Sequence, residues 1–187
     1  MSGEERMREA IDLLTAEHRL IGRVLASLGT FVSGLDPAAP ETREVLGDYI
    51  DFLRRYVEFR HERMEESIIF TELARYGGVA APVALLEEEH RQRAARLADM
   101  AAVAAAEGPL SEAEVAALDE AAALYSSHLR AHILKEDRAL FPLAGTLLPE
   151  DKIAQIAEGL AAFAQNTDHL ELVALAERLI ERYPPLS

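Results

Sequence analysis

The sequence predicts an all-α fold, in which four helices form an up-down-up-down bundle with an extra C-terminal helix. Apolar residues recur at spacings of three and four along nearly the whole chain, and no stretch alternates convincingly as a half-buried strand would. Ala, Leu, Glu and Arg dominate the composition, whereas aromatic residues make up only 6% of it. This composition favours helices. Because glycine and proline cluster at four places, we expect five helical segments.

The five expected helices follow one another through short connections, with bounds near 4–33, 41–75, 80–107, 111–141 and 149–182. The breaks between them are the glycine- and proline-containing stretches 34–40, 77–82, 108–109 and 142–149. Ser111 and Glu114 form an S-x-x-E capping box, which marks the start of the fourth helix. Pro149 suits the first turn of the fifth helix, which we expect to be interrupted around 166–168.

The connections also predict how the helices are arranged. Short loops between long amphipathic helices favour antiparallel neighbours. No stretch is long enough to act as a linker between domains, so we expect residues 1–187 to form a single domain. Its bundle core is expected near 4–141, and its C-terminal helical segment near 149–183.

Composition and charge exclude several classes of function. The chain has no Cys, so disulfides and thiolate metal sites are excluded, and any metal must be bound by His and carboxylate. A net charge of -14 argues against nucleic acid as a partner, because the phosphate backbone would be repelled. No run of about 18 uncharged apolar residues predicts a membrane span, and the N-terminus has no signal-like apolar region. We therefore expect a cytoplasmic protein, with the oligomeric state left open.

Two histidine–acid pairs with the same internal spacing recur in the two halves of the chain. HERME at 61–65 is matched 71 positions later by HILKE at 132–136. In each copy a second acid follows, and a phenylalanine stands five residues past the first acid. Upstream of each pair, a Glu-His-Arg triplet contains His18 and, 72 positions later, His90. Each half therefore contains a helix with one central histidine, followed by a helix with His-x-x-x-Glu.

This spacing predicts a shared metal site. Residues four apart lie on the same helix face one turn apart, so each His-x-x-x-Glu pair can reach one point in space. The histidines lie on apolar stripes, and burying them with two carboxylates is costly unless cations compensate the charge. Imidazole and carboxylate suit iron, manganese or zinc, and two bridging Glu suit a dinuclear centre. The candidate ligands are His18, His61, Glu65, His90, His132 and Glu136.

The pattern resembles the hemerythrin-like HHE cation-binding domains. The resemblance is carried by His18, HERME at 61–65, LLEEEHR at 85–91 and HILKEDRALFP at 132–142. It covers residues 10–145 and extends to the C-terminal helix. It implies an up-down four-helix bundle that holds a non-haem, usually dinuclear, iron centre with bridging carboxylates and an oxo or hydroxo group.

Two features depart from the oxygen-carrying hemerythrins. Ala94 stands where those carriers have a second histidine on the third helix, so one expected ligand is missing. The carriers also place the acid of the fourth helix at i+5, which nominates Asp137. We favour Glu136, because an i+5 position is rotated about 140° around the helix.

The resemblance and its departures together indicate a function. They favour binding or sensing of a small ligand, with oxygen, nitric oxide or iron as candidates, over bulk oxygen transport. One alternative is a di-iron redox enzyme, such as a catalase-like peroxide scavenger or an oxidase. Another is a structural bundle with one zinc ion.

The remaining candidate side chains have secondary roles. Glu58-x-x-His61 and Glu87-x-x-His90 fit the Glu-x-x-His pattern of ferritin-like di-iron proteins, but no equivalent precedes His132. For a further group of six residues we expect core packing, solvation or support of the ligands. The alternative for His128 is a fifth ligand, and the alternative for Tyr56 and Tyr125 is donation to a bound oxygen species. The group comprises His128, His169, Glu66, Asp137, Tyr56 and Tyr125. An apolar wall around the site is expected from Ile69, Phe70, Leu140 and Phe141.

Overall fold

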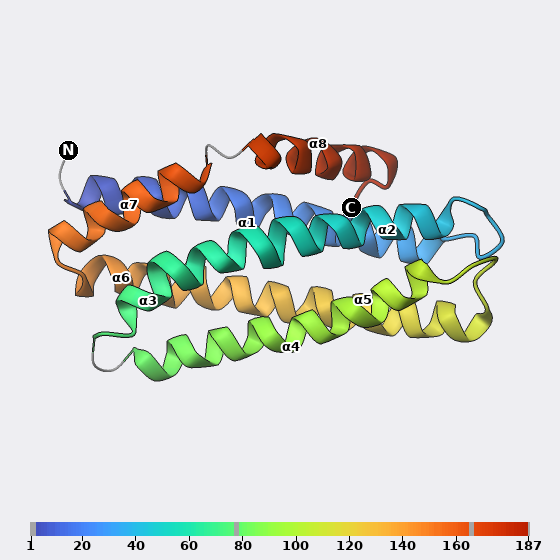
Figure 1. The fold of residues 1–187 in the computed structure, drawn as a ribbon, viewed down its shortest axis with the longest axis horizontal. Helices are drawn as coiled ribbons and strands as arrows, with labels where there is room; N and C mark the ends of the chain where they lie inside the picture. Colours follow the sequence, from blue (N-terminus) through green and yellow to red (C-terminus); the bar gives the residue numbers. More distant parts are fainter. Residues whose placement is uncertain (1–2, 77–78, 165–166, 187) are drawn as a thin grey trace.

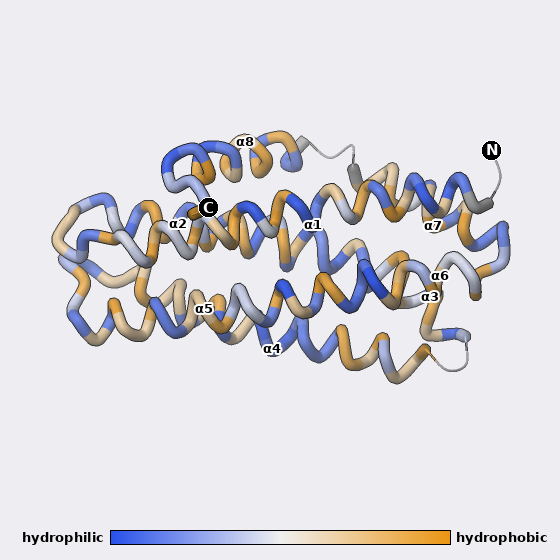
Figure 2. The backbone as a smooth tube through the Cα atoms, turned by 180° about the vertical axis from the view of Figure 1, so that it is seen from behind, coloured by the Kyte–Doolittle hydropathy of each residue, from blue (hydrophilic) through white to orange (hydrophobic). Residues whose placement is uncertain are grey.

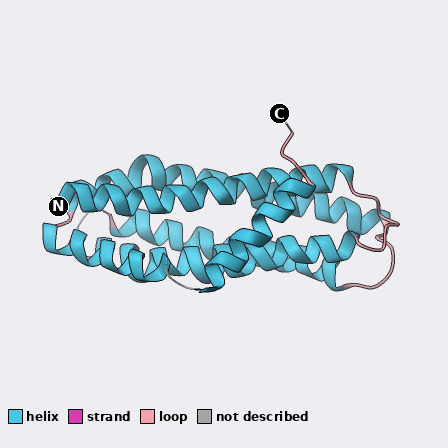
Figure 3. Cartoon of the chain, turned by 90° about the horizontal axis from the view of Figure 1, so that it is seen from above, coloured by secondary structure: helices cyan, strands magenta, loops and turns pink. Residues whose placement is uncertain are grey.

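The predicted all-α fold is confirmed by the structure of the chain, a computed structural model that describes residues 3–76, 79–164 and 167–186 (Figure 1). Within these ranges every regular element is a helix. Viewed from above, the long helices lie side by side, and the longer loops gather at one end (Figure 3). None of the described helices is both long and apolar enough to cross a membrane.

Four long helical segments form the bundle. The first is α1 (Gly3–Gly34), and the third is α4 (Ala80–Ala105). The second and fourth each contain wider π-helical stretches: α2 (Thr42–Phe52), η1 (Leu53–Glu62), η2 (Glu65–Phe70) and α3 (Thr71–Leu73), then α5 (Glu112–Lys135), η3 (Glu136–Leu140) and α6 (Phe141–Leu147). Each long segment runs antiparallel to the one before it (Figure 1).

The C-terminal segment is two helices, α7 (Glu150–Ala164) and α8 (Thr167–Arg182). α7 packs against α1 and η2, and α8 packs against α1 and α2. Both lie on the same outer side of α1 (Figure 1). The interruption expected around 166–168 falls partly outside the described residues, as does the break expected at Gly77 and Gly78.

The expected end of the fourth helix at 141 is wrong. The helix continues through Pro142 to Leu147, so the predicted break over 142–149 shrinks to the short turn before α7. The reason is the π turn just upstream, which is closed by the Phe141 N–H donating to the Glu136 carbonyl. Pro142 has no backbone N–H to donate to a helical hydrogen bond. It lies in the first turn of α6, where no such donor is needed.

The predicted start of the fourth helix is confirmed at Ser111. Its hydroxyl accepts from the Glu114 N–H, and the Glu114 carboxylate accepts from the Ser111 N–H, which completes the capping box. Gly108 precedes it with a φ of 76°, a left-handed conformation that favours glycine. Arg43 ties this turn to α2 by donating to the Gly108 carbonyl (2.7 Å) and to Glu114 (2.9 Å).

The core consists of two apolar clusters separated by a polar layer. Hydrophobic and hydrophilic residues are interleaved along the helices (Figure 2). On α1, one cluster ends at Leu14 and the other begins at Ile21. The second, third and fourth long segments show the same division. Between the clusters lies a layer of buried polar side chains, which includes a histidine from each long segment.

Candidate metal centre

The six residues predicted as ligands all lie in the polar layer. The carboxylates of Glu65 and Glu136 have no solvent exposure, and each of the four histidines is at most 4% exposed. They come together because each lies on the inward stripe of its own helix, at the level where the two apolar clusters part. The six are His18 on α1, His61 on η1, Glu65 on η2, His90 on α4, His132 on α5 and Glu136 on η3.

The four imidazoles form two close pairs. Nε2 of His18 lies 3.1 Å from Nε2 of His61, and Nε2 of His90 lies 2.9 Å from Nε2 of His132. Two nitrogens bound at right angles to one metal ion, with bonds of about 2.1 Å, lie about 3 Å apart. The spacing within each pair is therefore that of two ligands on one ion.

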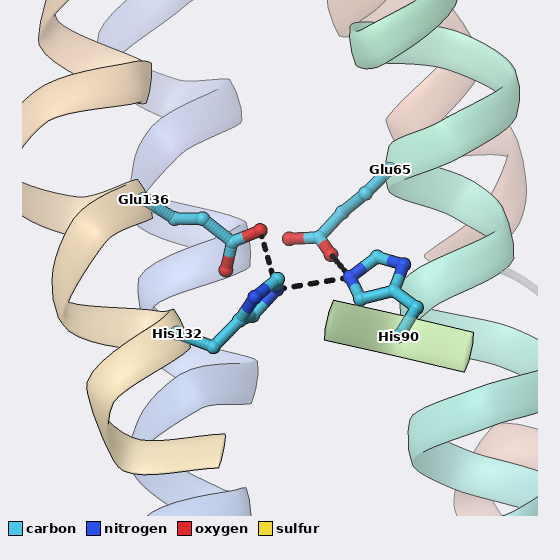
Figure 4. Close-up of side chains that lie close together, drawn as sticks. All are labelled: Glu65, His90, His132 and Glu136. Carbon is cyan, nitrogen blue, oxygen red and sulfur yellow. Dashed lines mark hydrogen bonds and ion pairs between the residues drawn. The ribbon is translucent and has the colours of Figure 1, made fainter. Parts of the chain in front are cut away.

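Each carboxylate reaches both histidine pairs. Oε1 of Glu65 lies 3.4 Å from His61 Nε2, and its Oε2 lies 3.9 Å from His90 Nε2. Oε1 of Glu136 lies 3.0 Å from His132 Nε2, and its Oε2 lies 3.5 Å from His18 Nε2. The two carboxylates point toward one another beside the imidazole rings (Figure 4). Both Glu are thus placed to bridge two ions, one beside each pair.

The outer nitrogens of all four histidines are bound by further carboxylates. The Nδ1···O distances run from 2.7 to 2.9 Å. An ionised carboxylate can only accept, so each Nδ1 carries a hydrogen, and in the neutral ring, the form that binds a metal, Nε2 presents a lone pair to the centre. This arrangement fixes the ring orientation and raises the basicity of Nε2. The partners are Asp137 for His18, Glu17 for His61, Glu66 for His90 and Glu89 for His132.

The charges in this layer strongly perturb one another. Burial and the facing Glu136 raise the pKa of Glu65. Burial and the charge on His132 lower the pKa of His90 to about 2. Burial disfavours charge on His18, yet Asp137, Glu65 and Glu136 together raise its pKa to about 10. Perturbations of this size in one small cluster are typical of functional sites.

The protein atoms alone do not satisfy this cluster. Both oxygens of Glu65 and both oxygens of Glu136 are buried without a hydrogen bond from any described residue. His132 Nε2 lies 3.0 Å from Glu136 Oε1, but without the alignment of a hydrogen bond. Unpaired buried carboxylates and facing lone pairs are both unfavourable, and cations between them relieve both. The donor set therefore fits metal binding.

Comparison with known families agrees with this geometry. The sequence matches the hemerythrin HHE cation binding domain over residues 7–144. The chain belongs to this hemerythrin family. No curated protein and no solved structure matches the chain. The matched region takes in most of each of the four long segments and contains all six clustered residues. The family binds cations, and the buried His and Glu cluster fits a metal site.

A π turn follows the clustered glutamate in both halves of this hemerythrin-family bundle. Thr71 N–H donates to the Glu66 carbonyl, and Phe141 N–H donates to the Glu136 carbonyl. The phenylalanine ending each turn stacks on a histidine from another helix: Phe70 on His90 (5.8 Å between ring centroids) and Phe141 on His18 (5.9 Å). The two phenylalanines of the sequence repeat thus form an apolar wall beside the cluster, as predicted for them. π turns often mark functional sites.

Several other predicted residues lie outside the cluster. His128 is exposed, and His169 on α8 is half-buried and stacks on Tyr56. Glu58 and Glu87, which the ferritin-like pattern nominated, are absent from the groups of described residues with converging ligand atoms. The buried tyrosines of the sequence analysis, Tyr56 and Tyr125, belong to the apolar cluster on one side of the layer.

Ala94 and two pairs of polar residues complete the surroundings. Ala94 lines an open pocket of about 260 Å³ beside His90, on the side where oxygen carriers of the family have their extra histidine. Glu17 and Glu89 were not among the residues predicted from the sequence, although their positions beside His18 and His90 in the repeat could have indicated a role. Arg60 and Arg93 were not predicted either; both are buried, and they donate to Glu17 and Glu62.

Proposed function

We propose that this chain holds a dinuclear iron centre and binds or senses a small ligand, with oxygen, nitric oxide or iron itself as candidates. The ligands are His18, His61, Glu65, His90, His132 and Glu136. The observation that carries the proposal is that each Glu directs one oxygen to each histidine pair. Two ions account for this arrangement, whereas one ion leaves a histidine pair unused.

The donor chemistry is compatible with iron. Four imidazoles and two carboxylates without thiolate suit iron, with manganese or zinc as alternatives. Bound iron supplies electron transfer and open coordination positions for a small ligand. The chain contributes the rest: Glu65 and Glu136 neutralise the cations, the histidines complete the ligand set, and Phe70 and Phe141 keep water away.

The hydrogen bonds favour binding over proton-transfer chemistry. Each clustered histidine has Nδ1 engaged by a carboxylate and Nε2 directed at the centre. None of the four is therefore free to act as a general acid or base. A protein that binds and releases a small ligand does not need such a group.

A second candidate is a redox enzyme that scavenges peroxide or acts as an oxidase. The observation in its favour is the open pocket that Ala94 leaves beside His90. Glu58 lines this pocket, and burial together with Glu62 raises its pKa to about 7. A carboxyl group with that pKa can exchange protons with a substrate near neutral pH.

Anaerobic reconstitution with ferrous iron tests both candidates. We expect two irons per chain, and optical bands on adding oxygen or nitric oxide that disappear when the ligand is removed. Rapid turnover of peroxide instead would support the enzyme. One zinc per chain with no iron would contradict both and leave a structural zinc site.

A pair of histidine variants tests the ligand set. His90→Ala should lower bound iron sharply, because it removes one ligand of a close pair. His128→Ala is the matched control, since this histidine is exposed and outside the cluster. Equal iron content in the two variants would contradict the assignment.

A further inference from the structure

The two histidine pairs of the metal centre differ in how well their surroundings shield them from water. His18 and His61 are the first pair, and His90 and His132 are the second pair. All four rings are buried, and each is held by one carboxylate. The difference lies in the groups that cover these carboxylates and in the space beside the rings.

The first pair has a carboxylate that is covered by a buried arginine. Glu17 is 6% exposed at the side chain and accepts from Arg60 at 2.6 Å. Arg60 is also buried, donates to the Phe163 carbonyl at the end of α7 (3.4 Å), and lies over the Tyr56 ring. A pocket of about 230 Å³ borders Glu17, but none of its lining residues is a candidate ligand. This side of the metal centre is therefore closed, and α7 helps to close it.

The second pair has more exposed groups at the corresponding places. Glu89 corresponds to Glu17 in the repeat and is 22% exposed at the side chain. The cation that pairs with Glu89 is Lys135, which is half exposed. Of the other two carboxylates, Glu66 beside the second pair is 41% exposed, and its repeat equivalent Asp137 beside the first pair is 30% exposed. In both comparisons the second pair is the one closer to water.

A pocket also lies directly beside the second pair. The open pocket of about 260 Å³ is lined by both His90 and Glu66. Ala94, one turn after His90 on α4, leaves this space open. An imidazole must turn away from a metal ion before the ion can leave, and close packing resists such a movement. Local opening is easiest where buried contacts are few and the surrounding groups are exposed. Release of an ion is therefore easier from the second pair.

We propose that the ion of the first pair stays bound, whereas the ion of the second pair exchanges with free divalent cation through the pocket beside His90. This inference rests on the proposed function, because it requires two ions. Glu65 and Glu136 each keep one oxygen directed at the first pair when the second ion leaves. Occupancy of the second position then follows the supply of ferrous iron, which favours iron itself among the candidate ligands.

Anaerobic release of iron from the full chain tests the proposal. Metal-free protein is loaded with ferrous iron, freed of excess metal, and mixed with a chromophoric ferrous chelator in a stopped-flow instrument. We expect two irons per chain, released in two phases of equal amplitude whose rates differ by about tenfold or more. Two irons released in a single phase would overturn the proposal and leave the dinuclear centre standing. An iron content other than two would contradict the proposed function, and this inference with it.

A matched pair of variants assigns the two phases. Glu66→Gln and Asp137→Asn lie at equivalent positions of the repeat, and each amide keeps an oxygen that can accept from the histidine Nδ1. Glu66→Gln should accelerate only the fast phase, by about tenfold, and Asp137→Asn should accelerate only the slow phase. The reverse assignment, or an equal effect of each variant on both phases, would show that the second pair is not the exchanging one.

A substitution in the pocket tests the route. Ala94→Leu fills the space beside His90 and should slow the fast phase several-fold, with the slow phase and the iron content unchanged. Ala95→Leu, at the next exposed position of α4 and outside the pocket lining, is the control and should change neither phase. A fast phase with the same rate in Ala94→Leu as in the unmodified protein would contradict release through this pocket.

Discussion

Each histidine of the metal centre is held by a carboxylate that is not itself a proposed ligand. Glu66 is the most accessible of these four carboxylates and accepts from His90 Nδ1 at 2.7 Å. Its side chain is 41% exposed, and glutamine in its place keeps an oxygen that can accept from His90 Nδ1, so Glu66→Gln removes the charge without leaving a buried group unpaired. It is therefore the cleanest test of how much these hydrogen bonds contribute to metal binding.

Glu66→Gln should lower the affinity for ferrous iron by roughly 10- to 100-fold, because partners of this kind orient the imidazole and raise its basicity. The affinity is measured anaerobically by competition with a chromophoric chelator. Glu87→Gln removes the same charge from the neighbourhood without touching a histidine. Equal affinities for the two variants would mean that only the local negative charge matters.

Glu58 predicts a dependence of stability on pH. Burial and Glu62 raise its pKa to about 7 in the folded protein, above the ordinary value of 4.5. A carboxyl whose pKa is raised by folding binds more protons in the folded state. Its contribution is therefore fully present below pH 4.5 and is lost as pH rises through about 7.

Glu58→Gln should stabilise the protein at pH 8 and have little effect at pH 4. Since Glu58 is partly exposed, solvent screening reduces the expected gain to about 1 kcal/mol, or about 2–4 °C in the melting temperature. Thermal melts at the two pH values give the difference. A gain of the same size at both values would exclude the raised pKa as its cause.

At the scale of helices, the sequence predicts a boundary correctly where chemistry within a few residues decides it. The start of α5 at Ser111 depends on a capping box that spans four residues, so it could be predicted directly from the sequence. The continuation of the fourth helix through Pro142 could not, because it depends on the π turn at η3. A π turn shifts the hydrogen-bond ladder by one residue without interrupting the apolar pattern, and it therefore leaves no clear mark in the sequence.

The capping box gives a prediction for the element that carries His132 and Glu136. Ser111→Ala removes the hydroxyl that accepts from the Glu114 N–H, and should cost about 1 kcal/mol of stability. Ser127→Ala, in the middle of the same helix, should be neutral within error because alanine favours helices. Chemical denaturation measures both, and iron content should stay unchanged in both. A loss of iron in Ser111→Ala would show that the end of α5 and the metal site are coupled.

For the whole molecule, the six candidate ligands could be predicted because they repeat with the fold. His18, His90 and the two His-x-x-x-Glu motifs all lie at one level of the bundle, where each of the four long segments has buried polar side chains. Arg60 and Arg93 could not be predicted, because their burial depends on which helices become neighbours. The repeat does not extend to them: Arg60 corresponds to Ala131, and Arg93 pairs with Glu62 on another helix.

The polar layer implies a trade-off between stability and metal binding. Burial and the facing charge of Glu136 raise the pKa of Glu65, so this close pair of carboxylates destabilises the metal-free fold when both are ionised, and neutral replacements of similar shape relieve that cost. Glu65→Gln/Glu136→Gln should therefore raise the melting temperature of the metal-free protein by several degrees.

The same double variant should lose the stabilisation by iron. At ferrous iron 100-fold above its dissociation constant, binding stabilises the unmodified protein by about 2.7 kcal/mol for each independent site. Anaerobic calorimetry with chelator and with iron measures both effects. Glu120→Gln/Glu181→Gln removes two exposed charges as a control and should change neither. A metal-free double variant less stable than the unmodified protein would indicate that Glu65 and Glu136 serve the fold itself. If the double variant is more stable than the unmodified protein without iron and is not stabilised by iron, these carboxylates serve metal binding and not the stability of the fold.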